Sequence, residues 1–552
     1  MSLKVNISTL TKGFQNNRTY FSIMSLIKTT LVVLLTVSIS SLLAQSKDSY
    51  SEIIWGESVT AKDGMTFNEL VAYDQSGMYI IKTNARGAYG VSTKFVIEHF
   101  DKEMNRTKSV NISLKEKGKK RRFHSALQLN NELYVLTLTV VKSSKELVLN
   151  AQTVDKNTLQ LNNDLKKIAS IDYSDYSIND QLSYAHSLSA DSSKLLIYEY
   201  LPDGKDKKRK FGLSVFDIQL KLLWNKTVVT DFKQKSSMLE DFKVDNEGNV
   251  HLVGITFKEG EPGFLKSRPN YRYRIFSYYD QGNRPVEFPV RLESKFLSEL
   301  RLEIDDDQNI VCGGLYSTRG NLNQNGSFFL KIDSQTREII SQSTQALPAR
   351  IVKKERKPGS RQKPSKKPLP TLTNYNLDDF ILKDNGGAIM IAEKYYRSLF
   401  STTNYNATTG PSTSNTTSYN YDDIIVTSIS AEGTIEWVKR IAKEQSSQDP
   451  GYYLSYLLLY DENNLHLVYN DDAKNLDREE GEKLHQFNRY SEAVTVMTTI
   501  DKEGSSSKQQ LFSQSEAEVI IRPAGGGKIS DSELVLCGQN KSKFRFAKIV
   551  FE

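Results

Sequence analysis

Apolar and polar positions repeat along this chain as one phrase: an apolar run, a turn rich in Asp, Asn and Gly, and a second apolar run. Each copy predicts a β-hairpin, because the runs are short and these turn residues tolerate a tight bend. Such a hairpin buries its apolar face only by stacking on its neighbours, so the copies must pack together. The eight copies begin at Leu70, Ala126, Ser187, Phe242, Leu302, Phe380, Leu457 and Val519.

A third and a fourth run follow each hairpin. The third is apolar and usually ends in an acidic residue, as in FGLSVFD ending at Asp217, with Ser430 as the exception. The fourth is more polar. Four strands in a repeat of about 65 residues are typical of a β-propeller blade, whereas solenoid repeats are shorter. No long helical periodicity occurs outside the N-terminus, so we expect few helices.

The three tryptophans predict how the ring closes. Trp224 lies seven residues after Asp217 and Trp437 seven residues after Ser430, so both occupy one position of the fourth strand. Trp55 lies in the similar segment SEIIWGESV, with no hairpin before it, while the last repeat stops after its third strand. An N-terminal strand that completes the last blade would remove the exposed sheet edges. The fold class is therefore all-β, a single β-propeller with eight four-stranded blades closed by N- and C-terminal strands; seven blades is the alternative.

The repeats also resemble a known group of proteins. SADSSKLL from Ser189 is similar to the TolB-type repeat of extracytoplasmic β-propellers, with Ala190, Asp191 and Ser192 in place of the usual Pro-Asp-Gly turn. The resemblance spans nearly the whole chain after residue 44. It implies a fold and carries over no catalytic residue, since propellers host binding and enzymatic functions alike.

Residues 1–44 read as an N-terminal extension and signal peptide. Lys28 precedes an apolar run from Leu31 to Leu43, and Ala44 suits a cleavage point, with Met24 as the expected start. The propeller then covers 45–552. The run from Leu31 to Leu43 falls short of the length of about 20 residues that a membrane span needs, and no second apolar run is long enough. We therefore expect an exported protein that is periplasmic, cell-surface or secreted, with no transmembrane span in the mature chain.

The net charge of +7 comes from one segment. Residues 350–370 carry nine Lys or Arg, one Glu and four Pro, so the remainder is close to neutral. This composition predicts a flexible basic linker, with polyanion binding as the functional alternative. The candidate polyanion-binding residues are Lys353, Lys354, Arg356, Lys357, Lys363, Lys366 and Lys367.

Two further segments interrupt the repeat. Residues 401–420 are rich in Ser, Thr and Asn, which predicts a polar, disordered loop. In KSRPNYRYR, strand periodicity places Arg272 and Arg274 on one face and Tyr271 and Tyr273 on the other. These four residues are candidates for binding an acidic or sugar ligand, although an ordinary half-exposed strand explains them more simply.

Residues with obvious chemistry are sparse. The sequence lacks a G-x-S-x-G elbow, a P-loop and an H-E-x-x-H motif, and its two Cys and six His show no metal-ligand spacing, so we expect no metal and no cofactor. Cys312 and Cys537 fall in distant blades and should be buried thiols. His251 and His466 share one repeat position and should be satisfied by neighbours. Acidic turns such as those at Asp245 and Asp305 suit hairpins better than calcium loops.

Three functions remain open from the sequence. The first is a non-catalytic extracytoplasmic propeller, expected to be monomeric, that binds a protein or glycan ligand. The second is a carbohydrate- or peptide-active enzyme whose site is assembled from several blades. The third is a structural component of the cell envelope that contacts polyanions through the basic segment. The first is favoured because His and other chemically active residues are few and unclustered.

Overall fold

The computed structural model describes residues 50, 52–60, 67–83, 93–116, 119–174, 182–201, 208–233, 236–257, 270–318, 324–348, 351, 374–406, 410–449, 451–461, 463–479 and 482–551. Residues Glu52–Val550 form one compact unit. The second unit, Met1–Ser51 with Phe551–Glu552, lies almost wholly outside the described residues, as do the predicted signal peptide and its cleavage point. No helix among the described residues is long and apolar enough to cross a membrane.

The compact unit is all-β and contains eight antiparallel sheets, each built on four strands. They are numbered here in chain order. Sheet 1 contains β3 (Phe67–Asp74), β4 (Gly77–Thr83), β5 (Lys94–Phe100) and β6 (Arg106–Ser113). Sheet 2 contains β8 (Lys119–Leu129), β9 (Glu132–Val141), β10 (Glu146–Asp155) and β12 (Lys166–Asp172), with the short β7 (Lys115–Glu116) and β11 (Gln160–Leu161) attached. Sheet 3 contains β13 (Ser183–Leu188), β14 (Lys194–Tyr200), β15 (Lys208–Asp217) and β16 (Leu222–Lys233).

Sheets 4 to 7 repeat this order. Sheet 4 contains β17 (Ser237–Val244), β18 (Val250–Phe257), β19 (Tyr271–Tyr279) and β20 (Arg284–Val290). Sheet 5 contains β21 (Phe296–Ile304), β22 (Ile310–Ser317), β23 (Gly326–Ile332) and β24 (Ile339–Ala346). Sheet 6 contains β25 (Tyr375–Leu382), β26 (Ala388–Asn406), β27 (Gly410–Ile429) and β28 (Ile435–Ile441), with β29 (Gln445–Ser447) attached. Sheet 7 contains β30 (Leu457–Tyr460), β31 (Asn464–Asp472), β32 (Ala493–Asp501) and β33 (Ser506–Ser513).

Sheet 8 is built from both ends of the unit. It contains β34 (Ile520–Ile521), β36 (Glu533–Asn540), β37 (Lys543–Val550) and the N-terminal β1 (Glu52–Trp55), with β2 (Val59–Thr60) and β35 (Gly527–Ser530) attached. β1 runs antiparallel to β37, with Glu52 opposite Val550 and Trp55 opposite Ala547. The predicted closure by N- and C-terminal strands is therefore confirmed, as is the placement of Trp224 and Trp437 in fourth strands.

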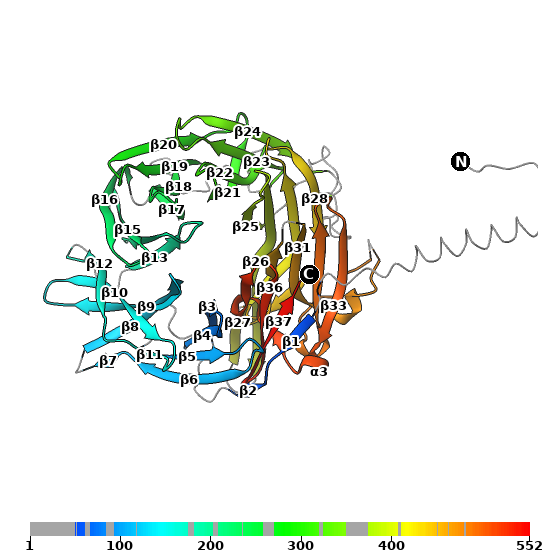
Figure 1. Cartoon of the computed structure of the whole chain (residues 1–552). Coiled ribbons are helices and arrows are strands. Elements are labelled where there is room, and N and C mark those ends of the chain that lie inside the picture. Colours follow the sequence, from blue (N-terminus) through cyan, green and yellow to red (C-terminus); the bar gives the residue numbers. More distant parts are fainter. Residues whose placement is uncertain are drawn as a thin grey trace, which may run out of the picture. The chain divides into compact units, whose positions relative to one another are not determined.

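Buried side chains join every sheet to the next around a closed ring. The second strands show how: Tyr79 and Ile81 of β4 pack against sheet 2, whereas Met78 and Ile80 pack against sheet 8. A strand that is buried on both faces needs an almost continuous apolar run, which is what the repeats supply. Separate cores join sheets 1 to 8 in sequence, and the last core joins sheet 8 back to sheet 1. The arrangement, with first strands inside and fourth strands outside, is consistent with a β-propeller (Figure 1).

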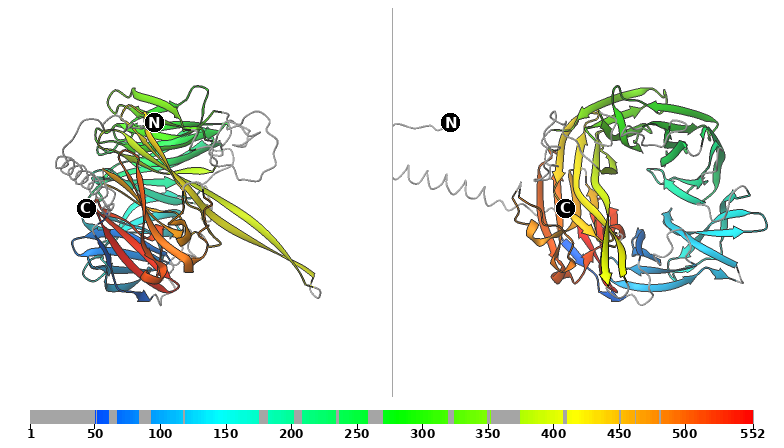
Figure 2. Two further views of the ribbon diagram at one scale, coloured as in Figure 1. Left: turned by 90° about the vertical axis from the view of Figure 1, so that its right-hand side faces the viewer. Right: turned by 180° about the vertical axis from the view of Figure 1, so that it is seen from behind.

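The polar segment 401–420 differs from expectation. Residues 401–406 and 410–420 are strand, and β26 and β27 continue as a paired hairpin that extends beyond the other strands (Figure 2). The prediction of a disordered loop was wrong because Thr and Tyr suit a strand. The backbone pairing of β26 with β27 also continues outward from the buried part of the hairpin. Leu399 and Phe400 are exposed on it. The basic segment also begins later than expected, since Ile351 is buried in the core between sheets 5 and 6.

Candidate functional site

The four predicted ligand residues of β19 lie on two opposite faces. The Tyr271 hydroxyl donates to the Leu297 carbonyl (2.9 Å) and the Tyr273 hydroxyl to the Ser298 carbonyl (3.2 Å), both on β21. On the other face, Arg272 is exposed and Arg274 pairs with Glu287 at 2.9 Å. The two tyrosines therefore join sheet 4 to sheet 5 through hydrogen bonds. That all four residues contact one ligand stays a prediction. The seven predicted polyanion-binding residues lie outside the described residues.

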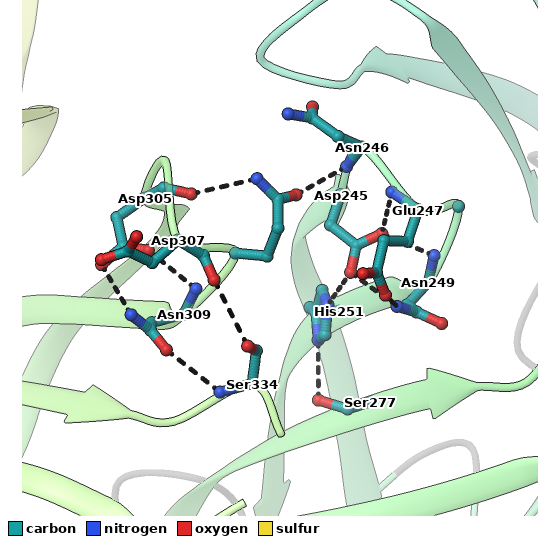
Figure 3. A network of polar contacts seen from close by, with 12 residues as sticks. Asp245, Asn246, Glu247, Asn249, His251, Ser277, Asp305, Asp307, Asn309 and Ser334 are labelled. Carbon is teal, nitrogen blue, oxygen red and sulfur yellow. Dashed lines mark hydrogen bonds and ion pairs between the residues drawn. The ribbon is translucent and has the colours of Figure 1, made fainter. Parts of the chain in front are cut away.

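The two strand histidines have partners, as predicted. His251 contacts Ser277 Oγ through Nδ1 (2.8 Å) and Asp245 Oδ2 through Nε2 (3.4 Å), and His466 contacts Thr499 and Asp461 in the same way. An Asp, a His and a Ser also make up the triad of serine hydrolases. Here Asp245, His251 and Ser277 are each at most 2% exposed, so no substrate reaches them (Figure 3). Their repetition in sheets 4 and 7 indicates a structural clamp.

The acidic turns behave as hairpin turns. The Asp245 carboxylate accepts the backbone N–H of Glu247 (3.0 Å) and of Asn249 (2.7 Å), and Asp305 accepts that of Asn309 (2.7 Å) (Figure 3). Carboxylates engaged in this way stabilise the turn and are not free to surround an ion. Among the described residues, no group of three or more His, Cys, Asp or Glu could hold a metal ion. Cys312 and Cys537 are buried free thiols, as predicted.

A cluster of carboxyl groups lies on the inner strands of sheets 4, 5 and 6. We call Glu240, Asp241, Glu299, Asp378 and Asp379, grouped around Arg301, the inner carboxyl cluster. Each of the three strands carries a register shift at this point, between Glu240 and Lys243, Leu297 and Glu299, and Leu377 and Asp379. Such bulges re-aim side chains and are common near functional sites.

Contacts between strands fix this cluster. The Arg301 Nε donates to the Leu377 carbonyl (3.0 Å), the Asp241 carboxylate accepts the Leu302 N–H (2.6 Å), and the Tyr456 hydroxyl donates to Asp379 (2.5 Å). Burial raises the pKa of the Glu299 carboxyl to about 7, opposed by Arg301 and reinforced by Glu240. Partial desolvation by the inner strands, reinforced by the carboxylates of Glu393 and Asp379, also raises the pKa of Asp378 to about 7. The side chain of Asp378 still contacts solvent. The cluster therefore holds carboxyl groups that exchange protons near neutral pH.

A cavity of about 930 Å³ lies between sheets 1 and 2. Sheet 1 contributes the β3–β4 turn with Asp74, Gln75 and Ser76, and Lys108 on β6. Sheet 2 contributes its β8–β9 turn and, after β10, Lys156 and Asn157. The volume falls in the range of roughly 300–1,000 Å³ that is typical of small-molecule sites.

The lining of the cavity includes one repeat position whose residue differs between the sheets. Lys108 lies seven residues after Asp101, so it occupies the position that holds Trp224 in sheet 3 and Trp437 in sheet 6. In sheet 3 the indole is 8% exposed and its N–H donates to the Gly248 carbonyl of sheet 4 (2.9 Å). In sheet 1 the slimmer lysine reaches the Asn157 carbonyl of sheet 2 (2.6 Å). Lys108 therefore lines the gap while it joins the two sheets.

Two lysines hold the cavity walls together. The Lys156 ammonium pairs with the Asp74 carboxylate across the gap (2.6 Å) and also donates to the Asn131 carbonyl (2.5 Å), while Lys108 spans the gap in the opposite direction. Hydrogen bonds from Lys156 and Ser76 lower the pKa of Asp74 although burial opposes them. The walls are thus set before any ligand arrives, which lowers the entropic cost of binding.

The lining carries no net charge and combines polar groups with the rings of Tyr73 and Tyr79. Two lysines balance Asp74 and Glu132, and the other exposed groups are the hydroxyls of Ser76 and Thr107 and the side-chain amides of Gln75, Asn131 and Asn157. Ser76 Oγ lies 3.1 Å from His99 Nε2, and burial lowers the pKa of His99, so the imidazole is neutral at pH 7. Neutral imidazole, amide and hydroxyl groups both donate and accept hydrogen bonds.

The sequence analysis missed both sites. The inner carboxyl cluster depends on which inner strands meet, and the hydrophobic pattern of a single strand does not show its neighbours. The cavity did leave a signal, because Lys108 occupies the tryptophan position of the repeat.

Comparisons with known proteins gave only structural likenesses. No protein-family model matches the chain, and no curated protein matches it. Similar solved structures include the β-propeller domain of the Trilobed protease from Pyrococcus furiosus, with a TM-score of 0.33, 10% identity, and coverage of 81% of this chain and 96% of that one. Another is the polysaccharide lyase Uly1, with a TM-score of 0.32, 9% identity, and coverage of 91% and 99%. A protein of unknown function from Bacteroides caccae has a TM-score of 0.26, 10% identity, and coverage of 64% and 92%. Likenesses this weak do not bear on the function of this chain.

Proposed function

We propose that this protein is an exported eight-bladed β-propeller, each sheet being one blade, that binds a glycan without catalysing its cleavage. The observation that carries the proposal is the cavity between sheets 1 and 2, with its preset walls and its uncharged, hydrogen-bonding lining. Export rests on the N-terminal sequence alone.

The lining favours a saccharide over other ligand classes. The rings of Tyr73 and Tyr79 lie among hydroxyl, amide and charged groups, whereas lipids and drug-like molecules normally bind in mostly apolar pockets. A polyanion would meet Asp74 and Glu132, while Lys108 and Lys156 are already engaged by oxygen atoms of the protein. A saccharide presents many hydroxyl groups that both donate and accept, which matches amide, hydroxyl and carboxylate partners.

The experiment begins with a glycan array probed with residues 45–552, followed by calorimetry with the best-binding oligosaccharide. Lys108→Trp places an indole in the cavity and should narrow it, so glycan binding should weaken while the fold is kept. The double variant Gln75→Ala/Asn157→Ala removes two exposed amides and should weaken binding by about 1–3 kcal/mol, or roughly five- to 150-fold.

Gln219→Ala is the matched control, because Gln219 and Asn157 hold the same turn position, each N–H donating to the Asp two residues earlier. The control should bind like the parent protein. Undiminished glycan binding by Lys108→Trp would reject the cavity as the site.

The inner carboxyl cluster favours a second candidate, an enzyme that acts on glycosidic bonds with a site assembled from several blades. A carboxyl with a pKa near 7, as at Glu299, can serve as a general acid at neutral pH. Incubation of the array hits with the protein would reveal new reducing ends or unsaturated products. Products that disappear in Glu299→Gln would favour the enzyme, and unchanged oligosaccharides would favour binding alone.

Contact with polyanions through the basic segment is a further proposal from the sequence. Retention on heparin at low salt, lost when residues 352–370 are deleted, would support it.

A further inference from the structure

A second cavity, of about 450 Å³, lies between sheets 6 and 7 at the place equivalent to the first. The first wall again includes the turn after an inner strand, with Asp384 and Asn385 in place of Asp74 and Gln75. The second wall again includes the turn after the third strand, with Asp501 and Lys502 in place of Asp155 and Lys156. Two of the eight gaps thus share one design.

Trp437 accounts for the smaller volume. It holds the repeat position of Lys108, and its indole N–H donates to the Lys502 carbonyl of sheet 7 (2.8 Å), as Lys108 donates to sheet 2. The ring is only half-buried and lines the cavity, unlike the buried Trp224. Aromatic rings beside polar groups provide a large rigid contact surface with a polar rim.

The lining of this cavity carries a net negative charge. Asp384, Glu436, Asp501 and Glu503 outnumber Lys383 and Lys502 by two. Lys383 pairs with Glu436 at 2.6 Å, and although burial opposes it, hydrogen bonds from Lys383 and Ser428 lower the pKa of Glu436, so the pair stays ionised at neutral pH. An acidic polysaccharide would be repelled, whereas a neutral one would find carboxylate and amide partners.

Both cavities open on the same face of the ring. In every sheet, the turn between strands one and two and the turn between strands three and four lie at the same end, because neighbouring strands are antiparallel. Both cavities are lined by these two kinds of turn. Only the gaps between sheets 7 and 8 and between sheets 8 and 1 separate them around the ring.

We propose that the cavity between sheets 6 and 7 is a second saccharide subsite, and that the two subsites together hold one long neutral polysaccharide along this face. The proposal rests on the proposed function, because it assumes that the first cavity binds a saccharide. Two linked subsites make the second contact intramolecular, which can strengthen polymer binding by roughly 100-fold to 10,000-fold over either subsite.

The test compares short and long ligands. The probes are cellohexaose, xylohexaose, mannohexaose and maltohexaose in calorimetry, and soluble cellulose derivative, xylan, glucomannan and starch in affinity electrophoresis. Lys108→Trp narrows the first cavity, and Asn463→Ala/Glu503→Ala removes two exposed groups from the second. Gln219→Ala is again the control.

The parent protein should bind two molecules of one hexaose, and each variant should lose one of them. Binding of the matching polysaccharide should fall at least tenfold in either variant and should be lost when the variants are combined. One hexaose site that is lost only in Lys108→Trp, with polymer binding unaffected by the second variant, would overturn the two-subsite proposal and leave the proposed function standing. Absence of any binding by the parent protein would overturn both.

Discussion

Trp55→Ala tests how the ring is held closed. Trp55 is half-buried on β1, its ring lies edge-on to Phe512 of sheet 7 at 4.8 Å, and the Arg545 guanidinium of β37 lies 4.7 Å from its centroid. Loss of the aromatic pair costs about 0.5–1.5 kcal/mol, loss of the cation–π contact about 0.5–1 kcal/mol, and loss of partial burial about 1–2 kcal/mol. Because these contacts share one side chain and are not fully additive, the closing strand should be destabilised by about 2–4 kcal/mol in total.

Hydrogen exchange measured by mass spectrometry localises this effect. If β1 detaches more readily, amides of β37 (Lys543–Val550) should exchange roughly 30-fold to 1,000-fold faster, since each 1.4 kcal/mol corresponds to a factor of ten. Peptides from β17 to β20 should be unchanged. Trp437→Ala is the matched variant, which should loosen sheets 6 and 7 and leave β37 protected. Equal protection of β37 in parent and Trp55→Ala would refute the closure by β1.

Three further predictions concern charge. The pKa of Glu299 rises from 4.5 to about 7 on folding, so between these pH values the folded protein binds more protons than the unfolded chain and loses stability as the pH rises. In urea unfolding, Glu299→Gln should therefore be more stable than the parent by roughly 2–3 kcal/mol at pH 8 and equal to it near pH 4. Lys156→Met leaves the Asp74 carboxylate without its lysine and should cost about 1.5–3 kcal/mol at pH 7. The cost should shrink as the pH falls below the ordinary Asp pKa of about 3.9, because the unpaired carboxyl of the variant then takes up a proton; an equal loss at pH 7 and pH 3 would contradict this assignment. Deletion of 352–370 removes eight Lys or Arg and one Glu, so it should lower the isoelectric point from 8.9 toward neutrality and leave the unfolding midpoint unchanged by scanning calorimetry.

Much of the fold was predictable from the sequence because each sheet repeats the same local signals. Apolar runs separated by Asp, Asn and Gly define the hairpins, and both faces of the second strands must be apolar because both are buried. The spacing of Trp224 and Trp437 was sufficient to predict that the segment of Trp55 closes the ring, which the pairing of β1 with β37 confirms. The hairpin at 401–420 was missed because its composition is typical of disorder, and composition does not show that a ladder continues outward.

The candidate sites were less predictable, for physical reasons. Glu299 and Asp378 lie on different inner strands, and the sequence of one strand does not show which residues of another strand come close to it. The cavity is a space between the side chains of two sheets, and an empty space has no sequence pattern of its own. Comparison of Lys108 with Trp224 and Trp437 across the repeats would have indicated it.

The most direct test is a crystal structure of the mature chain, residues 45–552, with the oligosaccharide that binds best on the array. The ligand should lie between the β3–β4 turn and the turn after β10, with its hydroxyl groups in contact with Gln75, Ser76 and Asn157. A ligand found instead on the inner carboxyl cluster beside Glu299 and Asp378, with the cavity between sheets 1 and 2 filled only by water, would contradict the proposed glycan site.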